Sequence, residues 1–92
     1  MSKDWESRVS EPVVMYTTPW CGYCRRLKMQ LAREGIEVTE VDIERDPGAA
    51  DYVMSVNGGL QMVPTVVLPD GVTLTNPSAA RIREHLRELT TG

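Results

Sequence analysis

The only two cysteines of this 92-residue chain stand three residues apart, at Cys21 and Cys24. The preceding residues 13–16 read Val-Val-Met-Tyr, an apolar, β-branched run typical of a strand that is buried on both faces. After the pair, Leu27 and Leu31 recur at helical spacing. The two cysteines therefore occupy a turn that leads from a buried strand into a helix, and this placement predicts a redox-active dithiol.

The thiol of Cys21 is expected to be the reactive one. Unpaired amides and the helix dipole at a helix N-terminus stabilise an anion, so Cys21 should ionise more readily than a free cysteine. Arg25, Arg26 and Lys28 add positive charge to the same helix, either to help hold the thiolate or simply as a solvated helix face. Because the thiolate is the nucleophile in disulfide exchange, Cys21 is the expected attacking group.

A structural role for the cysteine pair is an open alternative, either as small buried apolar side chains or as half of a zinc site. A tetrahedral zinc site needs about four nitrogen or sulfur ligands. Beyond the pair the chain offers only His85, which lies in a C-terminal helical pattern and is expected on a solvated face.

The chain is long enough for one domain and too short for a second. Its apolar and charged fractions, 41% and 25%, are ordinary for a soluble globular protein, and its net charge of -3 argues against a nucleic-acid partner. The N-terminal residues are charged and lack the apolar core of a signal peptide, and no segment is long enough to span a bilayer. We therefore expect a cytoplasmic protein with no membrane partner, in which a lone cysteine pair cycles between oxidised and reduced states.

Patterns along the rest of the chain predict the element order β-α-β-α-β-β-α. Gly35 is placed to end the first helix, and Asp46 with Pro47 supplies the cap and first position of a second helix. Pro-Asp-Gly at residues 69–71 provides a turn, so the two strands around it are expected to pair antiparallel. The expected elements span residues 13–16, 22–34, 36–43, 47–56, 62–68, 72–75 and 79–89.

Five segments carry a resemblance to a known family: residues 16–24 (Tyr-Thr-Thr-Pro-Trp-Cys-Gly-Tyr-Cys), 41–44 (Val-Asp-Ile-Glu), 55–59 (Ser-Val-Asn-Gly-Gly), 63–66 (Val-Pro-Thr-Val) and 74–78 (Leu-Thr-Asn-Pro-Ser). In this order of elements they resemble the glutaredoxin branch of the thioredoxin fold, and within it the mycoredoxins, which use mycothiol in place of glutathione. The resemblance implies an α/β, thioredoxin-like fold with a central four-stranded mixed sheet. The domain is expected to cover residues 12–92, with residues 1–11, including Trp5, as a loose N-terminal extension.

The resemblance also implies a site, in which Cys21 and Cys24 are the catalytic pair. Pro64 would follow a cis peptide bond, so that the Val63 backbone pairs with an extended thiol ligand; an ordinary proline at a strand entry is the alternative. Aromatic side chains beside the nucleophile would form a wall for a docked thiol, with Trp20 alternatively packed only on the rim. The expected thiol-binding residues are Trp20, Tyr23, Val63, Pro64, Thr75 and Asn76.

The start of the last helix favours mycothiol over glutathione. Glutathione-type glutaredoxins typically have two glycines and an acidic residue there, where the charged ends of glutathione bind, whereas this chain has Thr75 and Asn76. Hydroxyl and amide groups suit a neutral, sugar-bearing thiol, although a capping role alone for Asn76 stays open. Residues 60–62, Leu-Gln-Met, depart from the more polar stretch expected of a mycoredoxin, and Leu60 and Met62 would present an apolar surface to protein substrates.

Together these features predict a thiol-disulfide oxidoreductase that reduces mixed disulfides between proteins and mycothiol. Mycothiol would be the reducing co-substrate, with no tightly bound cofactor and no metal, and S-mycothiolated proteins would be the substrates of a monomeric enzyme. Two alternatives stay open. One is a thioredoxin-like dithiol donor that is fed by a flavin reductase and needs both cysteines. The other is a dimeric iron-sulfur cluster-binding module that uses Cys21 and an external thiol from each subunit.

Overall fold

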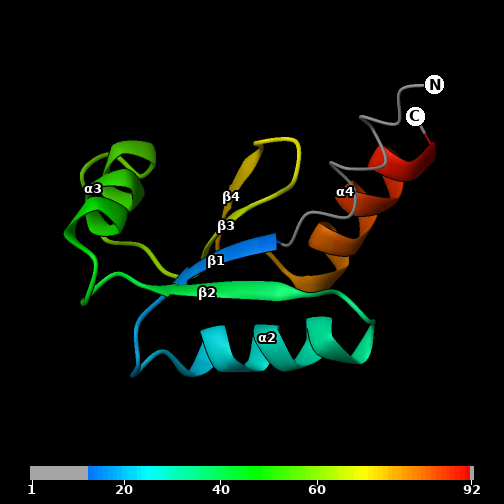
Figure 1. Cartoon of the computed structure of the whole chain (residues 1–92), viewed down its shortest axis with the longest axis horizontal. Coiled ribbons are helices and arrows are strands. Elements are labelled where there is room, and N and C mark those ends of the chain that lie inside the picture. Colours follow the sequence, from blue (N-terminus) through cyan, green and yellow to red (C-terminus); the bar gives the residue numbers. More distant parts are fainter. Residues whose placement is uncertain (1–12, 92) are drawn as a thin grey trace.

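The computed structural model describes residues 13–91, so residue 12 and the expected N-terminal extension with Trp5 lie outside the described residues. The observed order of elements is the predicted β-α-β-α-β-β-α (Figure 1). The elements are β1 (Val13–Thr17), α2 (Gly22–Arg33), β2 (Val38–Asp42), α3 (Pro47–Val56), β3 (Thr65–Val67), β4 (Thr73–Thr75) and α4 (Ala79–Thr91).

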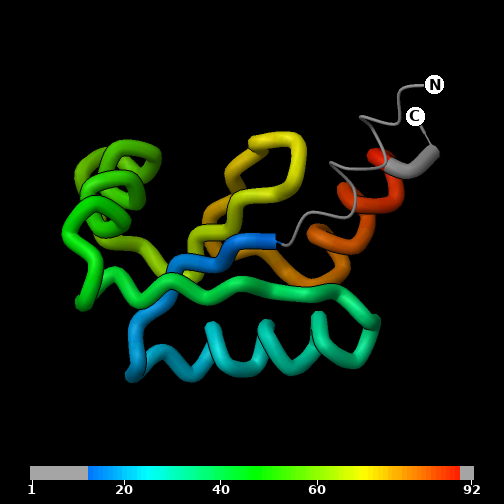
Figure 2. Tube along the Cα trace, in the orientation of Figure 1, coloured from blue at the N-terminus to red at the C-terminus, as the bar shows by residue number. Residues whose placement is uncertain are grey.

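The four strands form one mixed sheet, as the family resemblance implied, and their order in it is β2-β1-β3-β4. Strand β1 runs parallel to β2, with Val13 opposite Val38, and antiparallel to β3, with Tyr16 opposite Thr65. Strands β3 and β4 form the predicted antiparallel hairpin, in which Thr65 lies opposite Thr75. Figure 2 follows the chain from β1, in blue, through the cysteine turn into α2, in cyan.

Helices cover both faces of the sheet, and the alternation along β1 shows why. Met15 is fully buried in a core that it shares with Leu27 and Leu31 of α2 and Ile82 of α4. Tyr16 points the other way and packs against the smaller core under α3. Successive side chains of a strand point to opposite faces, so a buried central strand needs apolar residues throughout. Figure 1 shows α2 and α3 on opposite sides of the sheet.

Two predicted strands are shorter than expected. The run at residues 62–68 forms a strand only over Thr65–Val67, because the chain bends at Pro64, which has no N–H to donate to a neighbouring strand. The run at 36–43 is paired over Val38–Asp42, although Ile43 beyond its end is still 4% exposed and belongs to the core under α3. A run of apolar residues in the sequence indicates which residues are buried. In both of these runs, buried residues extend beyond the part of the strand whose backbone is paired.

Candidate active site: a dithiol at the start of helix α2

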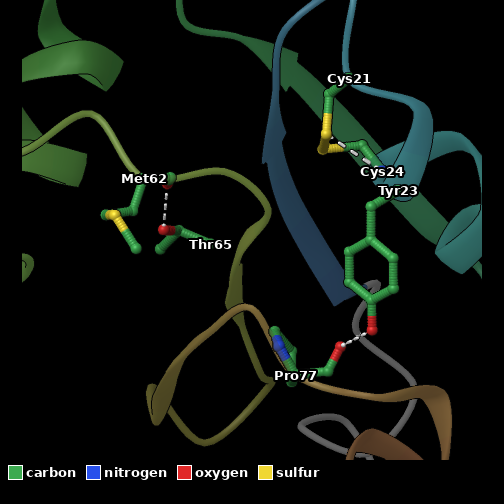
Figure 3. The surroundings of a disulfide bond; sticks show 6 residues. All are labelled: Cys21, Tyr23, Cys24, Met62, Thr65 and Pro77. Atoms are coloured by element: carbon green, nitrogen blue, oxygen red, sulfur yellow. Dashed lines mark hydrogen bonds between the residues drawn. A yellow bond between two sulfur atoms is a disulfide. The ribbon is translucent and has the colours of Figure 1, made fainter.

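Cys21 is the N-cap of α2, and its sulfur replaces the oxygen that usually caps a helix. Its backbone is extended, and its Sγ accepts a hydrogen bond from the Cys24 N–H at 3.1 Å. Cys21 and Cys24 form a disulfide, with their Cα atoms 5.3 Å apart (Figure 3). When this bond is reduced, the same amide and the dipole of α2 favour a thiolate on Cys21.

The two sulfurs differ in their access to solvent. Cys21 is 8% exposed and Cys24 only 1% exposed, since Cys24 lies in the first turn of α2 on the side that faces the core. An incoming disulfide can therefore reach Cys21 more readily. The difference favours Cys21 as the attacking group and Cys24 as an internal second thiol.

The aromatic residues beside the cysteines are tied to other parts of the fold. Trp20 is 69% exposed, and its indole N–H donates to the Glu44 carboxylate at 2.6 Å, just beyond β2. Tyr23 is half-exposed, and its hydroxyl donates to the backbone carbonyl of Pro77 at 3.1 Å, ahead of α4 (Figure 3). Trp20 thus stands on the rim with its ring largely in solvent, and Tyr23 connects the start of α2 to the start of α4.

The loop before β3 carries a cis peptide bond between Val63 and Pro64, as the resemblance implied. Pro64 is buried, and Val63 packs against both hydrophobic cores. Figure 3 shows Met62 in this loop and Thr65 at the start of β3, both on the side of β1 opposite α2, across from the disulfide. The Pro64 carbonyl accepts a hydrogen bond from the Asn76 N–H at 2.8 Å, which joins this loop to the segment before α4.

Asn57 holds three segments of the site together, a role that its residue type and position in the sequence did not predict. Its side-chain amide donates to the carbonyl of Val53 at 2.8 Å and to the Thr65 hydroxyl at 3.2 Å, and its side-chain oxygen accepts from the Thr75 hydroxyl at 2.6 Å. The Thr65 hydroxyl in turn donates to the Met62 carbonyl at 2.7 Å. The end of α3, the cis-proline loop and the end of β4 are therefore fixed to one another.

Asn76 has a conformation that explains its residue type. Its φ is 53°, in the left-handed region where asparagine is tolerated better than most residues. The cap of α4 is supplied by Ser78, whose hydroxyl accepts from the Arg81 N–H at 3.1 Å. Both Thr75 and Asn76 are exposed, so their side chains lie at the surface beside the cis-proline loop.

Replacing Asn57 with alanine is expected to lower the free energy of unfolding by about 1–3 kcal/mol, because the buried Thr65 hydroxyl loses its donor. The loop and β4 lose their common anchor as well, so KM for a substrate that binds beside this loop should rise more than kcat falls. Urea unfolding and steady-state kinetics measure the two effects. The matched control is Ser55→Ala, which removes only a hydrogen bond within α3; equal effects of the two substitutions would contradict the anchoring role.

The expectation that His85 lies on a solvated face is wrong. Its side chain is only 13% exposed, and its Nε2 lies 2.9 Å from a carboxylate oxygen of Asp70 in the turn between β3 and β4. Burial alone raises the pKa of Asp70, but hydrogen bonds from His85 and from the Val72 N–H outweigh it and hold that pKa below its ordinary value. Among residues 13–91, no three His, Cys, Asp or Glu side chains are grouped so that they could hold a metal ion.

The lowered pKa of Asp70 predicts a pH-dependent contribution to stability. An acid whose pKa is lower in the folded state stabilises the fold above its unfolded pKa, which is about 4, and this contribution is lost as the pH falls through the folded value. Asp70→Asn should therefore lower stability at pH 7 and have a smaller effect below about pH 3. Denaturant unfolding of both proteins at the two pH values measures this, and a constant difference would contradict it.

A mixed four-stranded sheet, a dithiol at the N-terminus of its first helix and a cis-proline loop nearby define a thioredoxin-like thiol-disulfide oxidoreductase. The glutaredoxin family model matches residues 13–73, and the chain belongs to the glutaredoxin family. In the part of the chain that the structure describes, no helix is both long enough and apolar enough to cross a bilayer.

Relatives and solved structures agree with this assignment. The chain is 51% identical to a glutaredoxin-family protein of Mycobacterium tuberculosis, over 85% of this chain and 93% of the relative. It is 44% identical to Mycoredoxin 1 of Corynebacterium glutamicum, over 76% and 86% of the two chains. Among solved structures, glutaredoxin from Archaeoglobus fulgidus superimposes with a TM-score of 0.62 at 26% identity, covering 100% of this chain and 97% of that one.

Proposed function

We propose that this oxidoreductase reduces mixed disulfides between proteins and mycothiol. The observation that carries the proposal is the cap position of Cys21, which combines access with a stabilised thiolate. The similarity to Mycoredoxin 1, and uncharged Thr75 and Asn76 at the surface near the cis-proline loop, support mycothiol as the small thiol. The expected setting is a cytoplasmic monomer whose substrates are S-mycothiolated proteins.

In the first step, the Cys21 thiolate attacks the mycothiol sulfur of the mixed disulfide. The protein sulfur leaves as a thiolate and takes a proton from solvent, and Cys21 is left bonded to mycothiol. Attack at this sulfur is favoured if the backbone of Val63, before Pro64, pairs with the mycothiol part. Trp20 and Tyr23 would stand beside the bound thiol on the other side of the cysteine turn.

Two routes regenerate the reduced enzyme. In the first, the thiolate of a second mycothiol attacks the sulfur of the mycothiol that is bonded to Cys21, which gives mycothiol disulfide and the free Cys21 thiolate. Alternatively, Cys24 attacks Cys21, which releases mycothiol and forms the intramolecular disulfide present in this structure. The disulfide then needs two electrons from two further thiols. That same disulfide suits the rival function, a dithiol donor in which both cysteines are required.

The small-thiol specificity is tested with one single-cysteine protein loaded with either mycothiol or glutathione, with the matching thiol as reductant. The mycothiol adduct is expected to be reduced at least about tenfold faster, equivalent to about 1.4 kcal/mol. Equal rates would mean a general glutaredoxin. No release from either adduct would favour the dithiol donor.

A single substitution in the same assay tests the role of Asn76. Asn76→Asp places a carboxylate where glutathione-type relatives are expected to bind an ammonium group, so it should shift the preference toward glutathione by about tenfold, since a hydrogen bond to a charged group contributes about 1.5–3 kcal/mol. Asp70→Asn, a charge change in the distant turn, is the control for general effects. An unchanged preference in Asn76→Asp would remove Asn76 from the proposed site.

A further inference from the structure

The outer face of α2 forms a basic groove next to the redox site. The groove has a volume of about 550 Å³, and its lining residues recur at spacings of three and four, on the side opposite the buried Cys24, Leu27 and Leu31. In Figure 1 the sheet lies against one side of α2. Two of the groove residues, Gln30 and Arg33, also line a second depression together with residues of α4. The residues of the groove are Gly22, Arg25, Arg26, Met29, Gln30 and Arg33.

The charge of this helix is opposite to that of the chain. The chain has 13 acidic and 10 basic residues, yet α2 holds four of the basic residues and none of the acidic ones. Lys28 is paired with Glu40 at 2.8 Å, but Arg25, Arg26 and Arg33 form no ion pair with any residue between 13 and 91. The groove therefore presents three guanidinium groups that have no partner within the described fold.

The length of the groove and its position beside Cys21 suit the binding of an extended peptide segment. Arg25 and Arg33 are eight residues apart, which corresponds to about 12 Å along a helix, or about four residues of extended chain. This span exceeds a single phosphate group and suits several carboxylates in a row. The groove begins at Gly22, the residue after Cys21, and contains Met29, which is 58% exposed and offers an apolar contact between the arginines.

We propose that this groove binds an acidic segment of the protein substrate that lies close in sequence to its modified cysteine. The inference rests on the proposed function, because it assigns the recognition of protein to α2 and the recognition of the small thiol to the cis-proline side. Guanidinium groups pair with carboxylates in fork geometry, so arginine is well suited to such a segment. The attraction also speeds encounter and is weakened by salt.

The test uses three peptides that carry mycothiol on one cysteine, flanked by acidic, neutral or basic residues. At low salt kcat/KM is expected to be about five- to tenfold higher for the acidic peptide than for the neutral one, and lowest for the basic peptide. The difference should shrink as ionic strength rises above about 0.1 M, where the screening length is about 10 Å.

A double variant, Arg26→Gln with Arg33→Gln, should remove most of this preference, measured as the ratio of kcat/KM for the acidic peptide to kcat/KM for the neutral one. The matched control, Arg45→Gln with Arg81→Gln, removes the same charge outside the groove and should keep the preference. The proposal would be overturned if both double variants lost the preference for the acidic peptide equally, or if the groove variant kept it. The neutral peptide reports separately on any effect of charge on the Cys21 thiolate.

The outcomes separate the two proposals. Release of mycothiol from all three peptides at equal rates would overturn the acidic-segment proposal and leave the proposed function standing. No release from any peptide would contradict the proposed function itself. Inhibition by a single-stranded oligonucleotide, without preference among the peptides, would assign the groove to nucleic acid and overturn the proposal as well.

Discussion

Replacing Cys21 with serine is expected to abolish reduction of a mycothiol-protein mixed disulfide, with a loss of at least about a thousandfold in kcat/KM. A serine hydroxyl stays protonated at neutral pH, so it supplies no nucleophile to attack sulfur. The cap hydrogen bond from the Cys24 N–H can still form to the serine oxygen, so the fold of α2 should be retained. Release of the protein thiol, followed with a thiol-reactive dye, measures the loss.

The matched variant is Cys24→Ser, which should keep mixed-disulfide reduction within about fivefold, because in the proposed mechanism a second mycothiol frees Cys21 without Cys24. Circular dichroism of both variants checks that they fold. Comparable, severe losses in the two variants would support the dithiol donor, which needs both cysteines. Activity retained in Cys21→Ser would overturn the assignment of Cys21.

Leu27→Ala is expected to have the largest effect on stability, a loss of about 2–5 kcal/mol. Leu27 is fully buried on the inner face of α2, in the core that also contains Met15 and Ile82, and alanine would leave a cavity there. Domains of this size are stable by only about 5–15 kcal/mol, so Tm should fall on the order of 10–30 °C. Urea and thermal unfolding, followed by circular dichroism, measure both quantities.

The control for Leu27 is Met29→Ala on the same helix. Met29 is 58% exposed, so its truncation should change the free energy of unfolding by about 0.5 kcal/mol or less. Similar losses in the two variants would mean that α2 is not anchored through its Leu27 face. Loss of the Leu27 side chain should also lower activity, because the position of Cys21 depends on how α2 packs against the sheet.

Local sequence signals predicted most of the fold. Asp46 accepts from the Ala49 N–H, and Pro47 occupies the first turn of α3, as their residue types indicate. Gly35 has a φ of 74° just after α2, in the conformation that glycine adopts most easily. Such signals act over a few residues, and apolar periodicity adds which face is buried. The cis bond before Pro64 and the mixed sheet came from the family resemblance instead.

Contacts between distant segments account for what the sequence could not predict. The bonds from Tyr23 to Pro77, from Trp20 to Glu44 and from Thr75 to Asn57 join residues 54, 24 and 18 positions apart. Each depends on how elements pack, and no local pattern encodes it. For the same reason a helical histidine with no apparent partner was expected in solvent, whereas the turn before β4 brings a carboxylate to it.

The most direct test of the proposed mechanism is the mass of the intermediate on Cys24→Ser. The reduced variant is mixed with an equal amount of S-mycothiolated protein, quenched with acid and measured by intact mass spectrometry. Attack at the mycothiol sulfur predicts that the variant gains the mass of one mycothiol less two hydrogens, located at Cys21, together with free substrate protein. A covalent adduct between the two proteins, or no adduct while substrate remains modified, would contradict the mechanism.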